Sequence, residues 1–541
     1  MTETARHSSL TRRAFMASAA LPLVGCAPER VIVGGFNGAS PERGHLLRKL
    51  PSSATPPIER RCDVLIAGGG IAGLSAARVL RQAGVEDFAL LELEDAAGGN
   101  SRAGSVGGIK CPLGAHYLPV PGDGAGEVRD FLEELGVAKR VAGRWTYDER
   151  HLAHSPQERL FFNGRWQEGL LPVQGVSART LEQYRLFSQR VAQAQKRARF
   201  TLPARGPVAA SHRALDAVTF VSWLDREGLN DEHLRWYLDY CCRDDYGAGI
   251  AIVSAWAGLH YFASRHGFQA PGEEGERDSV LTWPEGNGWL AGRLAQPLGE
   301  RLQAGRVVTR IVPLRQGVEV HAWDVAAGRM ERWQADQCVV ALPLFVAARV
   351  MGAPPRALAE AAPRMRYASW AVANVHIDRP LQDRAGAPAS WDNVLYGAAG
   401  LGYVDAGHQD LNPLPVPTVL TWYRALGEQA GARQQLLART WETWRDEVLD
   451  ELSVPHPDLR ARTLRVDVAR YGHAMAVPVP VTRGSTALAA LRRPQPGMWR
   501  RVHFAHADLS GYSIFEEAFT HGYRAGQAVL AAVGITAKRG R

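Results

Sequence analysis

The sequence predicts an α/β protein, and three features of residues 64–92 support this. A short apolar run, Val64 to Ala67, has the length and composition of a buried strand. It leads into Gly68-x-Gly70-x-x-Gly73, and apolar residues at helical spacing follow at once. A second apolar run then ends in an acid, Glu92. A strand, a glycine-rich turn, a helix and a second strand together make a βαβ unit.

The glycine spacing in this unit is the fingerprint of a dinucleotide site. Gly68 permits the tight turn, Gly70 lets the backbone approach a pyrophosphate, and Gly73 lets helix and strand pack closely. The helix that begins around Ala72 offers free N–H groups to the phosphates. Glu92 follows Gly68 by 24 residues, which suits a carboxylate on the ribose hydroxyls. A βαβ unit with a glycine-rich turn and no ligand is the alternative.

Two stretches after Glu92 narrow the cofactor. Gly98-Gly99-Asn100-Ser101-Arg102 comes first, and Leu113-Gly114-Ala115-His116-Tyr117 follows. Together they resemble the start of the flavin-containing amine oxidase superfamily. The resemblance implies FAD, bound by a Rossmann-type domain that is interleaved with an α+β substrate domain. It also implies phosphate contacts from Gly98, Gly99 and Arg102. Members often carry Arg directly after the glycine pair, where this chain has Asn100.

Two later segments extend the resemblance. A Val308-x-x-Ile311 strand matches the valine whose backbone meets the adenine in the family. Near the C-terminus, residues 502–512 form a strand and a turn, and the resemblance aligns Asp508 with the acid that binds the ribityl chain. Gly511 and Ser513 then open a helix that points at the flavin. Ser513 and Glu516 are spaced as a capping box, and Ala518, Gly522 and Gly526 leave one small helix face for close packing.

The resemblance also implies the division of the chain. We expect a signal at residues 1–26, a tether at 27–60, an FAD-binding domain at 61–125, 278–345 and 481–541, and a substrate domain at 126–277 and 346–480.

The first 26 residues resemble an export signal. Arg12-Arg13 is the adjacent pair of a twin-arginine signal, and the apolar stretch that follows is too short to span a bilayer. Leu23-Val24-Gly25-Cys26 resembles a lipobox with Cys26 as the lipidated residue. We therefore expect export by the twin-arginine machinery and a lipid-anchored protein on the periplasmic side of the membrane. An ordinary cleaved signal is the alternative.

Composition excludes some functions. The chain of 541 residues carries a formal net charge of +8, but it has five lysines and no dense basic run with interleaved aromatics, which argues against nucleic-acid binding. The five cysteines after Cys26 include no CxxC pair, so neither a metal site nor a disulfide framework is predicted.

The catalytic residues are less clear than the cofactor site. The family's reaction is hydride transfer from the carbon next to nitrogen to flavin N5, and many members place a lysine on a substrate-domain strand. The matching strand, residues 370–376, has no lysine. Asn374 could hold a water molecule there instead. The nearest ionisable candidates are His116, Tyr117 and His473, and each could equally be a packed, hydrogen-bonded ring.

Three functions remain open from the sequence. The first is an oxidase of a small-molecule amine, the second a desaturase or isomerase of an apolar substrate, and the third a flavoprotein without turnover. A carboxylate-lined cavity would favour the first and an aromatic tunnel the second. Asp244-Asp245 is the one tight acidic pair with aromatic neighbours, and it either faces the substrate or forms a helix-end ion pair.

Overall fold

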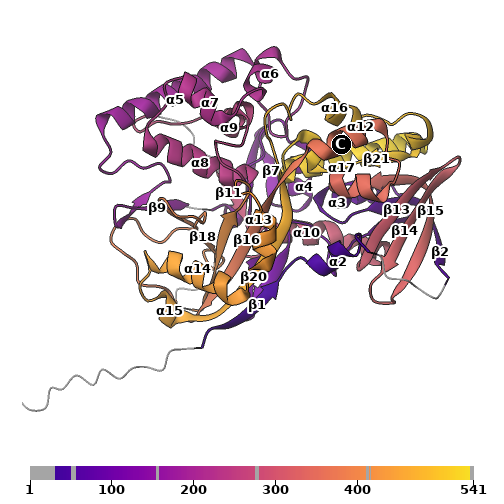
Figure 1. Ribbon diagram of the computed structural model, residues 1–541, viewed down its shortest axis with the longest axis horizontal. Helices are drawn as coiled ribbons and strands as arrows, with labels where there is room; N and C mark the ends of the chain where they lie inside the picture. Colours follow the sequence, from indigo (N-terminus) through magenta and orange to yellow (C-terminus); the bar gives the residue numbers. More distant parts are fainter. Residues whose placement is uncertain are drawn as a thin grey trace, which may run out of the picture.

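The structure is a computed structural model that describes residues 31–49, 56–153, 157–273, 279–409, 414 and 416–535. It confirms the predicted α/β fold. Figure 1 shows two sheets side by side, with the helices α5 to α9 gathered at one end of the second sheet. The expected signal, including Arg12, Arg13 and Cys26, lies outside the described residues.

The first sheet carries the βαβ unit and is assembled from three separate parts of the chain. Parallel strands form its centre, because β2 pairs in parallel with both β3 and β15, and β15 also pairs in parallel with β21. An antiparallel extension, β14 and β13, continues from β15. The strands in spatial order are β12 (Leu302–Gln303), β3 (Phe88–Leu91), β2 (Ile58–Ala67), β15 (Arg329–Val340), β14 (Gly317–Asp324) and β13 (Arg306–Leu314), with β21 (Val502–Phe504) beside β15.

Helix α3 (Ile71–Gln82) of the βαβ unit packs closely on the C-terminal helix α17 (Phe515–Ala532). The predicted small face of α17 makes this contact. A Cβ at Gly522 would lie 2.0 Å from the Ala72 carbonyl oxygen, and one at Gly526 would lie 2.7 Å from Val79 Cβ. The predicted capping box is wrong, because Ile514 is the N-cap and the Ser513 hydroxyl instead accepts a hydrogen bond from the Ala476 amide in the second sheet.

The second sheet is antiparallel at its centre. Strand β16 pairs with both β20 and β19 along most of its length. Helices α5 (Ala178–Arg197), α8 (Glu232–Tyr246) and α9 (Ala255–Ala263) contribute to one aromatic-rich core with it. The strands in spatial order are β1 (Val33–Asn37), β20 (Thr463–Val477), β16 (Arg366–Ile377), β19 (Thr418–Ala425), β18 (Tyr403–Asp405), β17 (Asp392–Leu395), β9 (Glu158–Phe162) and β10 (Arg165–Glu168).

The expected tether at residues 27–60 is wrong for much of its length. Residues Val33–Asn37 form strand β1, which pairs in parallel with β20, and Pro41–His45 form the short helix α2. Strand β2 already begins at Ile58. Ladder hydrogen bonds and a cation–π contact of Arg470 over the Phe36 ring, 3.5 Å from its centroid, hold a segment whose composition looked loose. The other domain limits stay predictions.

The five cysteines of the described chain are buried and free, in agreement with the absence of a predicted disulfide framework. Within the described residues, no helix combines the length and the apolar character needed to cross a bilayer.

Candidate active site and cofactor site

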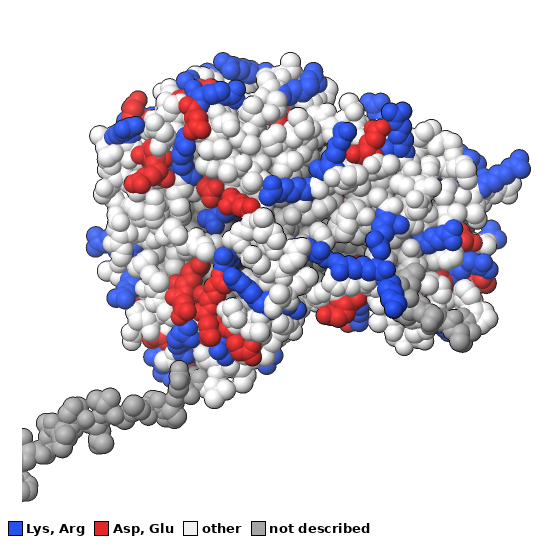
Figure 2. Space-filling model, viewed as in Figure 1, with Lys and Arg blue, Asp and Glu red and all other residues white. Residues whose placement is uncertain are grey.

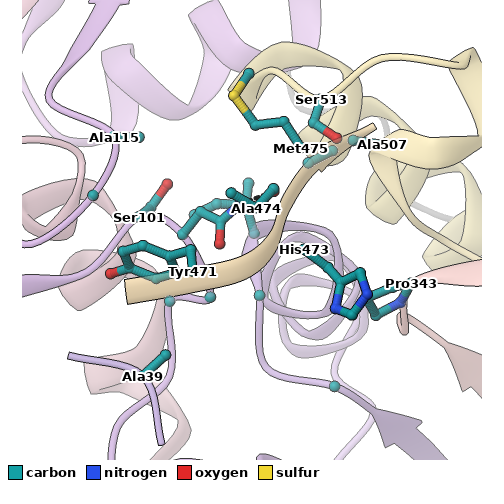
Figure 3. Close-up of a pocket in the computed structure, with 18 of the residues that line it drawn as sticks. Ala39, Ser101, Ala115, Pro343, Tyr471, His473, Ala474, Met475, Ala507 and Ser513 are labelled. Atoms are coloured by element: carbon teal, nitrogen blue, oxygen red, sulfur yellow. Dashed lines mark hydrogen bonds between the residues drawn. The ribbon is translucent and has the colours of Figure 1, made fainter. Parts of the chain in front are cut away.

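One cavity of about 740 Å³ joins the glycine-rich turn to the second sheet. Figure 3 shows Tyr471, His473, Ala474 and Met475 of β20 along one wall, with Ala39 and Ser513 on either side of them. Twelve of the residues predicted from the sequence line this cavity. They are Gly68, Gly70, Ala72, Glu92, Gly98, Gly99, His116, Tyr117, Val308, His473, Asp508 and Ser513.

The glycine turn leaves room for a phosphate in the cavity. Gly70 is the N-cap of α3, no side chain caps the first N–H groups of that helix, and a Cβ on Gly70 would meet nothing within 4 Å. The free N–H groups and the positive end of the helix dipole therefore face open space, as an anion site requires. Gly73 is different, since its missing Cβ would lie 1.9 Å from the Gly68 carbonyl oxygen.

Glu92 directly follows strand β3 and lies beside this turn. Its Oε2 accepts the Gly69 N–H at 2.8 Å and its Oε1 accepts the Glu94 N–H at 2.9 Å. Burial raises the pKa of Glu92, and the two backbone donors oppose that rise. Each carboxylate oxygen keeps a second lone pair for a ribose hydroxyl, so the predicted role fits the geometry.

Asp508 is a fully buried carboxyl group in the cavity lining. Its Oδ2 accepts from the Leu344 N–H at 2.9 Å and from the Tyr367 hydroxyl at 2.5 Å. Its Oδ1 is buried and accepts no hydrogen bond from the described residues. That oxygen lies 3.1 Å from His506 Nδ1, but this nitrogen itself accepts the Asp508 N–H. A buried, unpartnered carboxylate oxygen suits a ribityl hydroxyl.

Four predicted residues lie outside the cavity lining. Gly73 and Gly511 shape the turns behind it, and Arg102 donates to the Gly38 carbonyl at 2.9 Å and lies 3.7 Å from Glu94. Asn374 is buried in the second sheet, where its Oδ1 accepts the Thr421 hydroxyl at 2.9 Å. Trp370 and Val372 lie on the same face of β16 and line the cavity, but Asn374, two residues further along, does not, so the structure does not bring Asn374 to the site.

The opposite end of the cavity carries aromatic rings and acids. His116 stacks on Tyr423 with ring centroids 4.3 Å apart, and burial lowers the pKa of His116 to about 3. The ring is therefore neutral at pH 7. The Tyr117 hydroxyl donates to Asp244 Oδ2 at 3.0 Å. Burial, reinforced by the charge of Asp245, raises the pKa of Asp244 to about 7.

Asp244 and Asp245, at the end of α8, both line the cavity, and Asp245 also forms the helix-end ion pair that was the other alternative from the sequence. Asp245 also pairs with the buried Arg265 at 3.0 Å, while its Oδ2 has no partner. Glu516 in the first turn of α17 is 2% exposed, lines the same cavity and has an unpartnered Oε1. Burial raises the pKa of Glu516 to about 7. Three carboxyl groups and one arginine thus form an acidic wall.

Several lining residues were missed by sequence reasoning. Arg265, Tyr423, Arg433 and Arg48 come from segments far apart in the chain, and no local motif marks them. Glu516 was noted only as part of a capping box. His473 faces the cavity, where burial together with Arg433 and Arg48 lowers its pKa to about 4.

Comparison with known proteins gives the family and the fold of the chain. The sequence matches the flavin-containing amine oxidoreductase family over residues 71–530. A putrescine oxidase structure with bound putrescine superposes with a TM-score of 0.64 at 18% identity, covering 87% of this chain and 100% of that chain. Cyclohexylamine oxidase from Brevibacterium oxydans superposes with a TM-score of 0.62 at 19% identity, covering 87% and 99%. At such identities the likeness shows the shared fold.

Shorter matches link the chain to other proteins. A Baeyer-Villiger monooxygenase from Pseudomonas aeruginosa is 36% identical over 119 residues, which is 22% of this chain and 19% of that protein. Baeyer-Villiger monooxygenase 4 from Dietzia sp. is 37% identical over 65 residues, which is 12% and 11%. The chain thus spans less than a fifth of the length of these curated relatives. The family match covers far more than half of the sequence, and the chain belongs to the flavin-containing amine oxidoreductase family as an FAD-dependent oxidoreductase.

Proposed function

We propose that this protein oxidises a small-molecule amine whose ammonium group is held at the acidic wall. The observation that carries the proposal is the set of carboxyl groups on a cavity that also contains the dinucleotide turn: Asp244, Asp245 and Glu516, with the single cation Arg265 among them. A cavity for an apolar substrate has no need of buried acids, because each one costs desolvation free energy without a cationic partner. An alkyl ammonium supplies that partner.

We assign the lining residues the following roles in amine binding and oxidation. Asp244 and the Tyr117 hydroxyl bind the ammonium, and His116, Trp370 and Tyr423 exclude water around it. FAD, when bound, supplies the acceptor for the hydride from the carbon next to nitrogen. The amine must first lose one proton, and Asp244 with a pKa near 7 can accept it at neutral pH. The neutral amine then gives up the hydride from the carbon next to nitrogen, and water hydrolyses the iminium that remains to a carbonyl compound and an amine or ammonia.

Anaerobic reduction of the flavin tests the proposal. Purified holoprotein should lose its yellow colour with at least one primary amine from a panel of monoamines, diamines and polyamines, and should keep it with apolar alkenes and alcohols of similar size. Bleaching by an apolar compound alone would point to a desaturase, and no bleaching with any compound would point to a flavoprotein without turnover.

We further propose that the FAD is held non-covalently. None of the cysteines in the described chain lines the cavity, so no thiol is available there for a flavin bond. Acid precipitation should release the FAD into the supernatant. Flavin that stays with the denatured protein would contradict this.

Export by the twin-arginine route and anchoring through Cys26 are also proposals, supported by Arg12-Arg13 and the lipobox-like residues before Cys26. Because β1 begins at Val33, seven residues after Cys26, an extended link at about 3.5 Å per residue would place that strand within about 25 Å of the lipid. Replacing both arginines by lysine should trap holoprotein in the cytoplasm, and Cys26→Ala should leave export intact but release the protein from the membrane. Unchanged fractionation of either variant would refute that step.

A further inference from the structure

The segment that precedes the βαβ unit crosses the cofactor cavity. Its residues 33–48, which we call the N-terminal clasp, begin as β1 at the edge of the second sheet, with Val33 opposite Arg465 and Asn37 opposite Ala469. The chain then leaves the sheet and passes along the cavity. The clasp residues that line it are Ala39, Ser40, Pro41, Gly44, His45, Leu47 and Arg48.

The middle of the clasp is fastened beside the ribose acid. The Ser40 N–H donates to Glu94 Oε1 at 2.8 Å, and the Arg43 guanidinium lies 2.7 Å from Asp95. Glu94 is the residue whose own N–H is held by Glu92. The clasp therefore depends on the same loop that positions the proposed ribose contact.

The far end of the clasp reaches the first sheet's side of the cavity. Arg349 on helix α11 (Leu344–Val350) donates from Nε to the Leu47 carbonyl at 2.9 Å, and Leu47 packs against the hydrophobic cluster beneath that helix. A segment bound to both sheets and exposed to the cavity between them closes that cavity as a wall does. It is not a tether.

The clasp also contributes to a cluster of basic side chains that lines the cavity without carboxylate partners among the described residues. His45 Nε2 lies 3.4 Å from a guanidinium nitrogen of Arg433 on helix α13 (Ala432–Ala438), and Arg48, Arg349 and Arg470 line the same cavity. In the described chain, no carboxylate lies within ion-pair distance of these four arginines, although Glu42 is near enough to act on Arg470 and His45 through its charge. Arg433 Nε is buried without a hydrogen-bond partner. Figure 2 shows basic side chains gathered over the region where Figure 1 places α2.

We infer that the N-terminal clasp is part of the FAD site, and that its arginine cluster balances the negative charge of the bound diphosphate. An unpaired group of guanidinium ions favours an anion, and a dinucleotide diphosphate is the anion that this cavity takes. Asn100, which follows the glycine pair, donates to the Ala474 carbonyl oxygen and brings no positive charge to the cavity.

Charge-removing variants test the cluster. Arg48→Gln and Arg433→Gln should each weaken FAD binding to apoprotein about tenfold or more, as expected for loss of one charged contact. Lys49→Gln removes the same charge next to Arg48 but from a side chain that does not line the cavity, and it should bind FAD as wild type does. FAD titration followed by flavin fluorescence measures all three. Wild-type affinity in both arginine variants would overturn the inference.

ADP separates the diphosphate from the flavin. It should bind apoprotein in competition with FAD, and its affinity should fall in the arginine variants and with added KCl. An ADP affinity that the arginine variants leave unchanged would overturn the assignment of the cluster to the diphosphate.

Two neighbouring glycines test the clasp itself. A Cβ at Gly34 would lie 1.8 Å from the Val466 carbonyl oxygen, whereas one at Gly35 would meet nothing within 4 Å. Gly34→Ala should therefore loosen β1 and release FAD faster, while Gly35→Ala should not. Neither residue lines the cavity. FAD release can be followed by flavin fluorescence after rapid dilution of the holoprotein. Equal release rates in the two variants would refute a role for the clasp in retaining FAD.

Discussion

The two ends of the cavity present different kinds of group to a ligand. At the dinucleotide end, the uncapped N-terminus of α3 and the open space at Gly70 present backbone N–H groups. At the substrate end, the binding groups are side chains that carry charge in a buried place, above all Asp244, Asp245 and Glu516. Backbone donors do not titrate, while buried carboxyl groups do. Binding at the glycine turn should therefore be sensitive above all to side-chain volume, and binding at the substrate end to charge and pH.

The largest effect is expected from volume at the dinucleotide end. Gly73→Ala would place a Cβ 1.9 Å from the Gly68 carbonyl oxygen, against backbone that has little room to shift. We expect loss of bound FAD and a fall in the free energy of unfolding of about 1–3 kcal/mol or more. Thermal unfolding and the ratio of absorbance at 450 and 280 nm measure both.

A matched glycine shows whether the effect is steric. Gly292 lies in helix α10 (Gly288–Ala295), where an added Cβ would meet nothing within 4 Å, so Gly292→Ala should keep its FAD and gain slightly in stability. If Gly73→Ala retained FAD to the same extent as Gly292→Ala, close approach of backbone would not explain the fingerprint.

The contrast also explains what could be predicted from the sequence. Gly68, Gly70, Gly73 and Glu92 lie within one local βαβ unit, whose spacing follows from strand and helix geometry. The arrangement of the two domains followed from a resemblance that spans most of the chain. The clasp was missed because its proline- and glycine-rich composition resembles a linker, and its pairing with β20 depends on residues more than 400 positions away.

Even less of the substrate end could be predicted from the sequence. Its acidic wall joins α8, the loop that holds Arg265 and the first turn of α17, and only the folded chain brings these together. Asn374 was chosen by its position on a strand, and it shares a face of β16 with Trp370 and Val372. The cavity lining ends at Val372 on that face, and the Thr421 hydroxyl occupies the Asn374 oxygen. A local signal did exist for Asp244 and Asp245, the acidic pair among aromatic residues.

The second effect in size concerns charge at the substrate end. Asp244→Asn keeps the shape of the side chain and an oxygen for the Tyr117 hydroxyl but removes the negative charge. We expect kcat/KM for a reactive amine to fall about 100- to 1000-fold, on the order of 3–4 kcal/mol, because a buried ammonium would lack its counter-charge. FAD content should not change.

Glu232→Gln at the exposed start of α8 is the control, since it removes the same charge from the same helix away from the cavity. An Asp244→Asn enzyme with wild-type kcat/KM would show that the amine binds elsewhere.

A smaller loss is expected when charge is removed at the dinucleotide end. Glu92→Gln keeps one acceptor for the Gly69 and Glu94 N–H groups and weakens the contact to the ribose. The dissociation constant for FAD should rise about 10- to 100-fold, as for loss of one charged hydrogen bond. Fluorescence titration of apoprotein measures it, and circular dichroism checks that the fold is kept. Unchanged FAD affinity would move the ribose contact to another residue.

The smallest effect is a dependence of amine affinity on pH. The pKa of Asp244 is raised to about 7 by burial and by Asp245, so this carboxyl is largely protonated below pH 7 and ionised above it. Only the ionised form attracts an ammonium.

A tert-butylamine probe has no hydrogen on the carbon next to nitrogen and cannot be oxidised, and as an alkyl ammonium it stays charged up to about pH 10. Its dissociation constant, read from the flavin absorbance of holoprotein, should rise about tenfold per pH unit below 7 and level off above pH 8. Glu516, with a pKa also near 7, lines the same cavity and can steepen this slope. In Asp244→Asn the affinity should be lower throughout and any remaining slope should belong to Glu516, whose replacement by Gln in the same background should then flatten the profile. A wild-type profile that is flat between pH 6 and 8 would mean that the two ends of the cavity do not differ in the way their chemistry implies.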